Sequence, residues 1–277
     1  MNNRSKKLCV ILLLALIIFS SQQNSLFAES DSKKDKLSKE FFLGCKDDFL
    51  EVLVSPKEWR GKSLLKFSAI VGAGLLLYAL DGDIHQWSQD NQSKTSEGFS
   101  KFITRFGDGY VLLGLMTALY ASGEVFHQNS LRKTALLGIE SWLTSGVIVT
   151  GVKIVFGRAR PYTDESSRSF HPFSLRSRSH SFPSGHSSSV FAVATVIAEQ
   201  SEKAYIDILA YSIASLVAVS RVYNDKHWAS DILIGSSIGY FVAKKICSLN
   251  EDRDSDRVRI NLQLSRQRRA VSITFSF

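Results

Sequence analysis

The chain has 277 residues, a hydrophobic fraction of 44% and a formal net charge of +8. This length suits one large domain or one membrane bundle, and the basic balance suits nucleic acid, a membrane surface or an anionic substrate. The aromatic residues do not alternate with a Lys/Arg stripe, so nucleic acid is excluded as a predicted partner. Three cysteines, Cys9, Cys45 and Cys247, have no metal or redox spacing, and a disulfide between the last two is left open.

Residues 1–28 are predicted to be a secretory leader. A basic start precedes the twelve-residue apolar core 8–19, and a small-residue cleavage site follows at Ala28. Twelve residues are short for a membrane span, which favours a cleaved signal peptide over an anchor. Residues 29–62 are rich in Lys, Asp and Ser and are predicted to be a polar lead-in, with one short amphipathic stretch around 41–54.

Six apolar segments follow, and they predict an all-α fold with a bundle of about six core helices. They lie at roughly 63–80, 110–126, 134–156, 187–200, 205–222 and 229–246. Most are about 17–23 residues long, which suits membrane-spanning helices, and their closely spaced small residues allow tight packing in a bilayer. Charged residues within two segments (Glu140, Lys153 and Asp207) keep a soluble helical bundle open as a second hypothesis.

Positive charges predict which end of the bundle faces the cytoplasm. Arg132 and Lys133 precede the third segment, and Lys244 and Lys245 end the sixth. Because basic loops are retained in the cytoplasm, the polar stretches at the other segment ends are predicted to face outward. A cleaved leader followed by six spans would place those stretches inside, so the number of spans and the fate of the leader stay open.

The stretch 220–231, between the fifth and sixth segments, combines a cation, an imidazole and a carboxylate. If a helix begins near Trp228, His227 and Asp231 share one face, and Asp231 can accept a hydrogen bond from one ring nitrogen of His227. The other ring nitrogen is then free as a nucleophile or base. Arg221 could hold an anion in front of that nitrogen. An ordinary His–Asp pair in a polar loop is the alternative.

A second stretch, 153–161, carries two cations. Lys153 and Arg160 are about two helical turns apart, and Pro161 is expected to end the helix at Arg160. Two cations at the mouth of a helix suit an oxyanion such as phosphate. The alternative is a lysine that reaches the membrane surface beside an interfacial arginine cluster.

A third stretch, 181–186, is typical of an anion-binding helix start. Ser184 is the expected N-cap of the following helix, and Gly185 lets the backbone approach a ligand. Free N–H groups at a helix N-terminus bind anions, and His186 beside the anion can give a proton to a leaving oxygen. The alternative is a capping turn with a surface histidine.

The three stretches occur in a specific order and spacing: Lys153-(six)-Arg160-Pro161, then Pro183-Ser184-Gly185-His186, then Ser220-Arg221-(five)-His227-(three)-Asp231. This pattern resembles the type 2 phosphatidic-acid phosphatase family, which shares its site with class A acid phosphatases and vanadium haloperoxidases. The resemblance covers about residues 63–246, and every motif position is filled.

The resemblance implies a role for each position. His227 resembles the nucleophile that becomes a phosphohistidine, Asp231 its orienting partner and His186 the general acid for the leaving alkoxide. The implied phosphate-binding residues are Lys153, Arg160, Ser184, Gly185 and Arg221. Three cations and a helix N-terminus stabilise phosphoryl transfer without a metal, and no metal-type carboxylate cluster accompanies them, so no cofactor is predicted.

The predicted function is hydrolysis of a lipid phosphate or diphosphate monoester at the outer face of a membrane, in the inner membrane of a bacterial-type envelope with a periplasm-facing site. The partners are the lipid phosphate and the membrane. A secreted soluble acid phosphatase, which suits the leader better, and a vanadium-dependent haloperoxidase are the alternatives. A non-catalytic lipid-phosphate binder is disfavoured because both histidines are present. The lipid and the oligomeric state stay open.

Two further segments carry weaker signals. The basic connection 162–182 is expected to lie over the site, where it could recognise a head group or a second phosphate, or simply be an exposed basic loop. Residues 247–277 form a charged tail in which apolar and polar residues alternate from 258 to 264 and from 271 to 277. This alternation predicts one β-hairpin.

Overall fold

The computed structural model describes residues 36–201, 203–264 and 269–275, so the predicted leader lies outside the described residues. The fold is all-α, as predicted. The helices are α2 (Lys39–Val54), α3 (Lys62–Asp90), α4 (Lys94–Ile103), α5 (Gly109–Val125), α6 (Asn129–Phe156), α7 (Gly185–Glu199), α8 (Ala204–Tyr223) and α9 (Ala229–Arg257). Short 3-10 helices are η2 (Ser55–Glu58), η3 (Thr104–Gly107), η4 (Pro161–Thr163) and η5 (Ser177–Ser179).

All six predicted apolar segments form helices, and the structure adds two more. α3 continues past its predicted end near residue 80 to Asp90. α2 lies within the segment predicted as a polar lead-in, and α4 was not predicted because its sequence has little apolar content. α4 is instead fixed at its start by a reciprocal capping box between Ser93 and Ser96.

Four helices in the described part of the chain are long and apolar enough to cross a membrane. They are α3, α6, α8 and residues Ala229–Arg253 of α9. In α3 only 6% of the most apolar 18-residue stretch is buried, and the side chains of Leu65 and Leu76 are about 70% exposed. An exposed apolar surface of this kind suits lipid rather than water. The protein is therefore a membrane protein, and these four helices are its candidate spanning segments.

The helices run back and forth, so the polar stretches and the basic pairs gather at opposite ends. α6 ends, α7 begins, α8 ends and α9 begins at one end of the bundle, here called the site end. At the far end the Lys244 ammonium donates to the Glu199 carboxylate at 2.8 Å, and Lys245 lies 3.9 Å from Glu58. This separation is the one that the charge pattern requires, whereas the side of the membrane on which each end lies stays a prediction.

α7 and α9 pack with their backbones in contact because α9 carries two glycines at the crossing. A Cβ atom added to Gly235 would lie 2.4 Å from the Ser184 carbonyl oxygen, and one added to Gly239 would lie 2.1 Å from that of Ser188. No larger residue fits at either position without moving a helix. This close packing places the N-terminus of α7 over the first turns of α9, where the Ser184 N–H donates to the Asp231 carbonyl oxygen at 2.9 Å.

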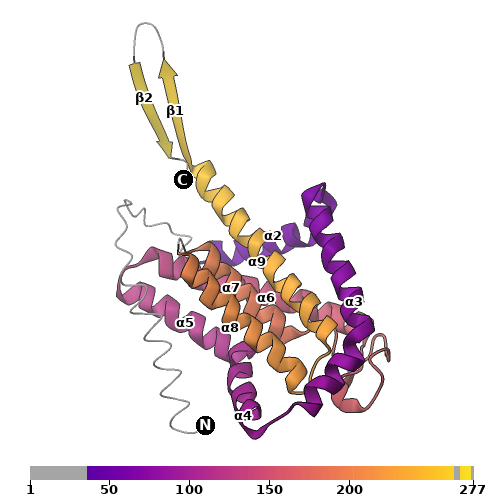
Figure 1. Ribbon diagram of the computed structural model, residues 1–277. Helices are drawn as coiled ribbons and strands as arrows, with labels where there is room; N and C mark the ends of the chain where they lie inside the picture. The colour runs from indigo at the N-terminus through magenta and orange to yellow at the C-terminus, as the bar shows by residue number, and fades with distance from the viewer. Residues whose placement is uncertain (1–35, 202, 265–268, 276–277) are drawn as a thin grey trace.

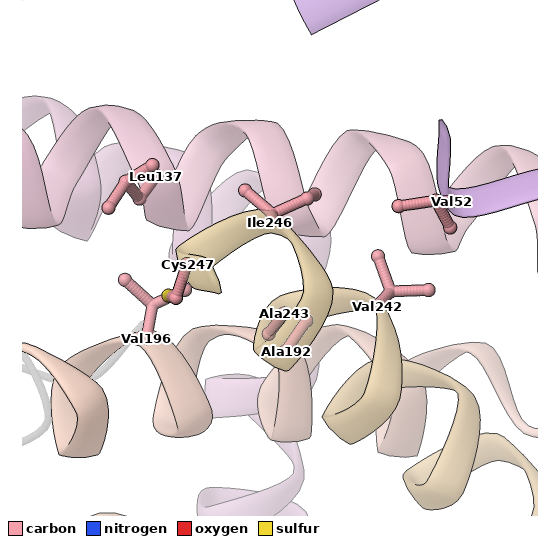
Figure 2. Packing of buried hydrophobic residues seen from close by; sticks show 8 residues of the cluster. All are labelled: Val52, Leu137, Ala192, Val196, Val242, Ala243, Ile246 and Cys247. Carbon is pink, nitrogen blue, oxygen red and sulfur yellow. The ribbon is translucent and has the colours of Figure 1, made fainter. Parts of the chain in front are cut away.

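The apolar core of the far half lies where α6, α7 and α9 meet, with one side chain from α2 (Figure 2). Its members are Val52, Leu137, Ala192, Val196, Val242, Ala243, Ile246 and Cys247. Cys247 and Cys45 are both free thiols, so the structure does not contain the disulfide that the sequence left open. α2 is thus packed onto the bundle rather than being a linker.

The tail forms an antiparallel hairpin beyond α9. β1 (Val258–Leu264) pairs with β2 (Arg269–Phe275), with Val258 opposite Phe275 and Leu264 opposite Arg269. α9 runs along the bundle and leads directly into this hairpin, which projects away from the helices (Figure 1).

We expect Gly239→Ala to destabilise the protein by about 1–3 kcal/mol, because the new methyl group overlaps the backbone of α7. Thermal unfolding in detergent measures this. Gly72→Ala on α3 is the control, since an added Cβ there meets no atom within 4 Å, and it should leave the midpoint unchanged or slightly higher. Equal midpoints for the two variants would contradict the proposed importance of the α7–α9 contact.

Candidate active site

His227 is held in a single tautomer at the turn between α8 and α9. The ring is 2% exposed, and its Nδ1 lies 2.7 Å from the Ser181 carbonyl oxygen. A carbonyl oxygen can only accept a hydrogen bond, so Nδ1 carries the proton and Nε2 keeps its lone pair. The second ring nitrogen therefore keeps the free lone pair that a nucleophile or base needs, and its role as nucleophile stays a prediction.

The expected contact between Asp231 and His227 is replaced by a different arrangement. The Asp231 Oδ2 atom is 3.8 Å from Nδ1 of His227, which is beyond hydrogen-bond distance. Oδ2 instead accepts from the Ser181 hydroxyl at 2.5 Å and from the Trp228 N–H at 3.0 Å. Oδ1 accepts from Nη1 of Arg158 at 2.6 Å. Asp231 therefore acts on the imidazole through Ser181, whose carbonyl is the group that binds it.

The end of α6 also differs from the prediction that Pro161 ends the helix at Arg160. The helix ends at Phe156, because Gly157 adopts a left-handed conformation with φ of +60°. A Cβ there would lie 1.7 Å from the His171 carbonyl oxygen, so only glycine fits. The chain then runs extended through Arg158 to Arg160, and the Arg160 N–H donates to the Arg178 carbonyl oxygen at 3.0 Å.

Three cations surround the imidazole. The Lys153 ammonium donates to the His180 carbonyl oxygen at 2.8 Å, and Nη1 of Arg221 donates to the Thr104 hydroxyl at 2.6 Å. The Nε atoms of Arg160 and Arg221 are buried without a hydrogen-bond partner. Buried guanidinium donors without partners are costly, and an oxyanion between them would satisfy them.

The N-terminus of α7 supplies backbone donors beside these cations. Ser184 is the N-cap, as predicted: its hydroxyl accepts from the Ser187 N–H at 3.4 Å and from the Ser187 hydroxyl at 2.8 Å. Gly185 begins the helix, and a Cβ added to it would lie 3.7 Å from Cε of Lys153. The helix N-terminus and the lysine therefore adjoin, and both favour an anion.

Both histidines are neutral at pH 7. Burial lowers the pKa of His186 to about 4, and the charge of Arg221 lowers this pKa further. Burial also lowers the pKa of His227 well below its ordinary value, and the charges of Lys153, Arg160 and Arg221 act in the same direction. Each of the three cations thus acts electrostatically on both rings, which shows that the predicted site residues converge.

Several residues of the site were not singled out from the sequence. They are Asp81 on α3, Thr104 in η3, Arg158 after α6, Ser181 before α7 and Ser230 on α9. Arg158 stands within the predicted 153–161 stretch, and its position two residues before Arg160 in an extended segment is the signal that could have found it. Ser181 and Ser230 likewise lie within the predicted stretches 181–186 and 220–231, whereas Asp81 and Thr104 lie outside any predicted stretch.

The connection 162–182 lies over the site, as expected, through its backbone. The carbonyl groups of Arg178, His180 and Ser181 accept from Arg160, Lys153 and His227. The side chains of three basic residues (Arg168, Arg176 and Arg178) are exposed, and so are Phe173 and Leu175 at 72% and 80%. Head-group recognition by these side chains stays a prediction.

In the ranges 36–201, 203–264 and 269–275, no group of three His, Cys, Asp or Glu side chains could hold a metal ion. The fold and the site together describe a helical membrane protein with a cluster of three cations around a buried imidazole that has one unprotonated nitrogen. Residues 135–254 match the family model of the PAP2 superfamily. The predicted resemblance is therefore confirmed.

Two curated relatives and one solved structure are similar to the chain. A lipid A 1-phosphatase of Porphyromonas gingivalis is 28% identical over 66% of this chain and 38% of its own length. A lipid A 1-phosphatase of Rhizobium etli is 26% identical over 66% of this chain and 82% of its own length. The crystal structure of Aquifex aeolicus LpxE, 23% identical with a TM-score of 0.50, covers 61% of this chain and 95% of that one, and it supports the fold.

The lowered pKa of His186 predicts how stability depends on pH. Between pH 6.5 and 4 the unfolded chain binds a proton that His186 in the folded protein does not, so stability should fall as the pH falls through this window. Thermal unfolding in detergent, at several pH values, measures the loss. The His186→Asn variant should lose less stability over this pH range. Added inorganic phosphate should reduce the loss of stability in the wild type, because its negative charge offsets the charge of the cations. Equal losses in both proteins would contradict the prediction.

Proposed function

We propose that the protein is a phosphatase that removes the phosphate group from a lipid phosphate or diphosphate through a phosphohistidine intermediate. The observation that carries this proposal is the fixed tautomer of His227, whose unprotonated Nε2 is available within the cluster of Lys153, Arg160 and Arg221. Such an arrangement suits phosphoryl transfer, in which the protein mainly positions the groups and stabilises charge.

In the first step, Nε2 of His227 attacks phosphorus, so that a P–N bond forms while the P–O bond to the lipid breaks. The three cations bind the non-bridging oxygens, and the backbone N–H groups at the start of α7 add to them. Asp231 stabilises the positive charge on the phosphorylated ring from 3.8 Å and holds Ser181 in place. The Ser181 carbonyl keeps accepting from Nδ1 throughout the step.

His186 supplies the proton that the leaving alkoxide needs. With a pKa of about 4 it holds no proton at neutral pH in the anion-free protein. A bound phosphate brings negative charge against Arg221, the charged neighbour that lowers this pKa most, and so raises the pKa of His186 again. His186 can then carry a proton only while substrate is present. In the second step, neutral His186 takes a proton from the water that attacks the phosphohistidine and releases phosphate.

The apolar, membrane-type surface of the protein favours a lipid substrate over a soluble one. α3 leads from the far end to the site end with an almost wholly exposed apolar surface, so the site opens near one surface of the bilayer. The similar proteins of P. gingivalis and R. etli are named lipid A 1-phosphatases, which supports a phosphorylated lipid of the envelope as substrate class. The basic pairs at the far end support an outward-facing site in the inner membrane.

We expect His227→Asn to lower phosphate release by on the order of 10³-fold or more, because the nucleophile is lost. Release from a lipid phosphate by purified protein in detergent with EDTA measures this. The wild type should also form an acid-labile, alkali-stable phosphoenzyme that the variant lacks. His127→Asn is the matched control, since His127 is exposed in the turn between α5 and α6 at the far end. Activity retained in the His227→Asn variant would refute the proposed role of His227 as the nucleophile.

Substrate preference tests the lipid branch separately. On a panel of a phosphatidic acid, a polyprenyl diphosphate, a lipid A phosphate and a soluble phosphomonoester, we expect kcat/KM to be at least about tenfold higher for one of the lipids, since part of the binding energy comes from the acyl chains. A preference for the soluble ester would instead favour an acid phosphatase, and EDTA-sensitive release would contradict metal independence.

A further inference from the structure

α3 is mostly exposed to lipid, yet it buries one polar side chain deeply near the site end. Its buried positions are Gly74, Asp81 and Ser88, which are spaced by seven residues and so share one face. This face packs on α9, where a Cβ added to Gly74 would lie 3.2 Å from Ile234. Asp81 is 1% exposed, and a carboxylate at such a position in a spanning helix is costly unless it is paired.

Asp81 is fully paired, and its partners belong to the site. Its Oδ1 accepts from the Ser230 N–H at 2.9 Å, and its Oδ2 accepts from the Ser230 hydroxyl at 2.5 Å. Oδ2 also accepts from Nη2 of Arg158 at 2.7 Å. Arg158 and Ser230 are 1% and 3% exposed, so the whole cluster is shielded from solvent, where charge-assisted hydrogen bonds are strongest.

The contacts continue from this cluster to the nucleophile. Nη1 of Arg158 donates to Oδ1 of Asp231, whose Oδ2 accepts from the Ser181 hydroxyl. The Ser181 carbonyl then accepts from Nδ1 of His227. Each link is a hydrogen bond of 2.5–2.7 Å between buried groups. Asp81 therefore holds the guanidinium group of Arg158, which in turn holds Asp231. Asp231 then holds Ser181, whose carbonyl sets the tautomer and position of His227.

A second residue of α3, His85, also contacts the turn that carries His227. Nε2 of His85, one turn further along α3, lies 2.6 Å from Oδ1 of Asp225, whose φ of +58° marks a tight turn two residues before His227. The His85 ring also packs edge-on against Trp228, with ring centroids 5.3 Å apart. α3 thus contacts the segment 225–231, which carries His227, through both Asp81 and His85.

We propose that Asp81 is a positioning residue for the reaction of His227, acting through Arg158, Asp231 and Ser181. Asp81 lies outside residues 135–254, the part of the chain that matches the superfamily model, so this role belongs to a helix that the superfamily match does not include. The kinetic part of the proposal rests on the proposed phosphatase function, whereas the structural part does not.

The structural part is tested by hydrogen–deuterium exchange on purified protein in detergent. Asp81→Asn keeps the shape of the side chain but removes its charge. We expect peptides that cover 181–184 and 225–231 to exchange faster than in the wild type, by about tenfold at the fastest-responding amides. Asp83→Asn is the matched control, because Asp83 is exposed on the same helix two residues away, and it should leave exchange unchanged. Unchanged exchange in Asp81→Asn would overturn the proposal.

The kinetic part is tested by phosphate release. We expect Asp81→Asn to lower kcat by about tenfold or more, as loss of a supporting contact does at other sites, while KM stays within about twofold and Asp83→Asn retains wild-type values. Because Asp81 acts through Asp231, the double variant Asp81→Asn/Asp231→Asn should be about as slow as Asp231→Asn alone. Fully multiplicative losses would indicate two independent effects and overturn the pathway.

If Asp81→Asn does not fold, Ser230→Ala decides the question, since it removes one hydroxyl from the same cluster and leaves the ion pairs. It should raise exchange at 225–231 and lower kcat by a few fold, and wild-type behaviour would overturn the proposal. A wild-type protein that releases no phosphate from any panel member would refute the proposed function alone. The exchange results would then still show whether Asp81 orders the turn that carries His227.

Discussion

The structure depends on one buried guanidinium. Arg158 is 1% exposed and lies between the carboxylates of Asp81 and Asp231, so it joins α3, the end of α6 and the start of α9. The rings of Tyr78 and Trp228, centred 4.9 Å and 5.6 Å from its central carbon, cover it on the apolar side. A buried charge must keep its partners, because removing one leaves the other uncompensated. The three segments therefore cannot move independently of one another.

This constraint explains why the site can tolerate its own charges. Lys153, Arg160 and Arg221 repel one another, and burial together with their joint field keeps His227 and His186 unprotonated. An arrangement of like charges is stable only if the surrounding fold fixes it. The His180 carbonyl oxygen accepts from Lys153, and the Thr104 hydroxyl accepts from Arg221. The backbone N–H of Arg160 donates to the Arg178 carbonyl oxygen, so each of the three residues is tied to its surroundings. In the proposed reaction, the cations would thus be in place before the phosphate binds, which avoids reorganisation during the reaction.

The sequence predicted those parts of the structure that local pattern controls. The six apolar segments became helices, Ser184 caps α7 as its position indicates, and the spaced cations and histidines converge. The sequence-based prediction failed where groups from distant segments compete for a side chain. Asp231 was expected to bind His227 by helical spacing, but Arg158 and Ser181 occupy its oxygens. Asp81, 146 positions before His227 in the numbering, has no spacing pattern that could reveal it, since only the packing of α3 on α9 brings it there.

α3 shows how the membrane and the site depend on each other. This helix buries little apolar surface against the bundle, so hydrophobic packing alone does not hold it in place. Polar contacts at its site end do: Asp81 to Ser230 and His85 to Asp225, and just beyond the helix Gln92 to the Tyr223 carbonyl at 2.9 Å. Asp81 and Ser230 are buried, so water does not compete for the hydrogen bonds between them, which strengthens these bonds. These contacts, together with that of His85, hold α3 against the turn that carries His227.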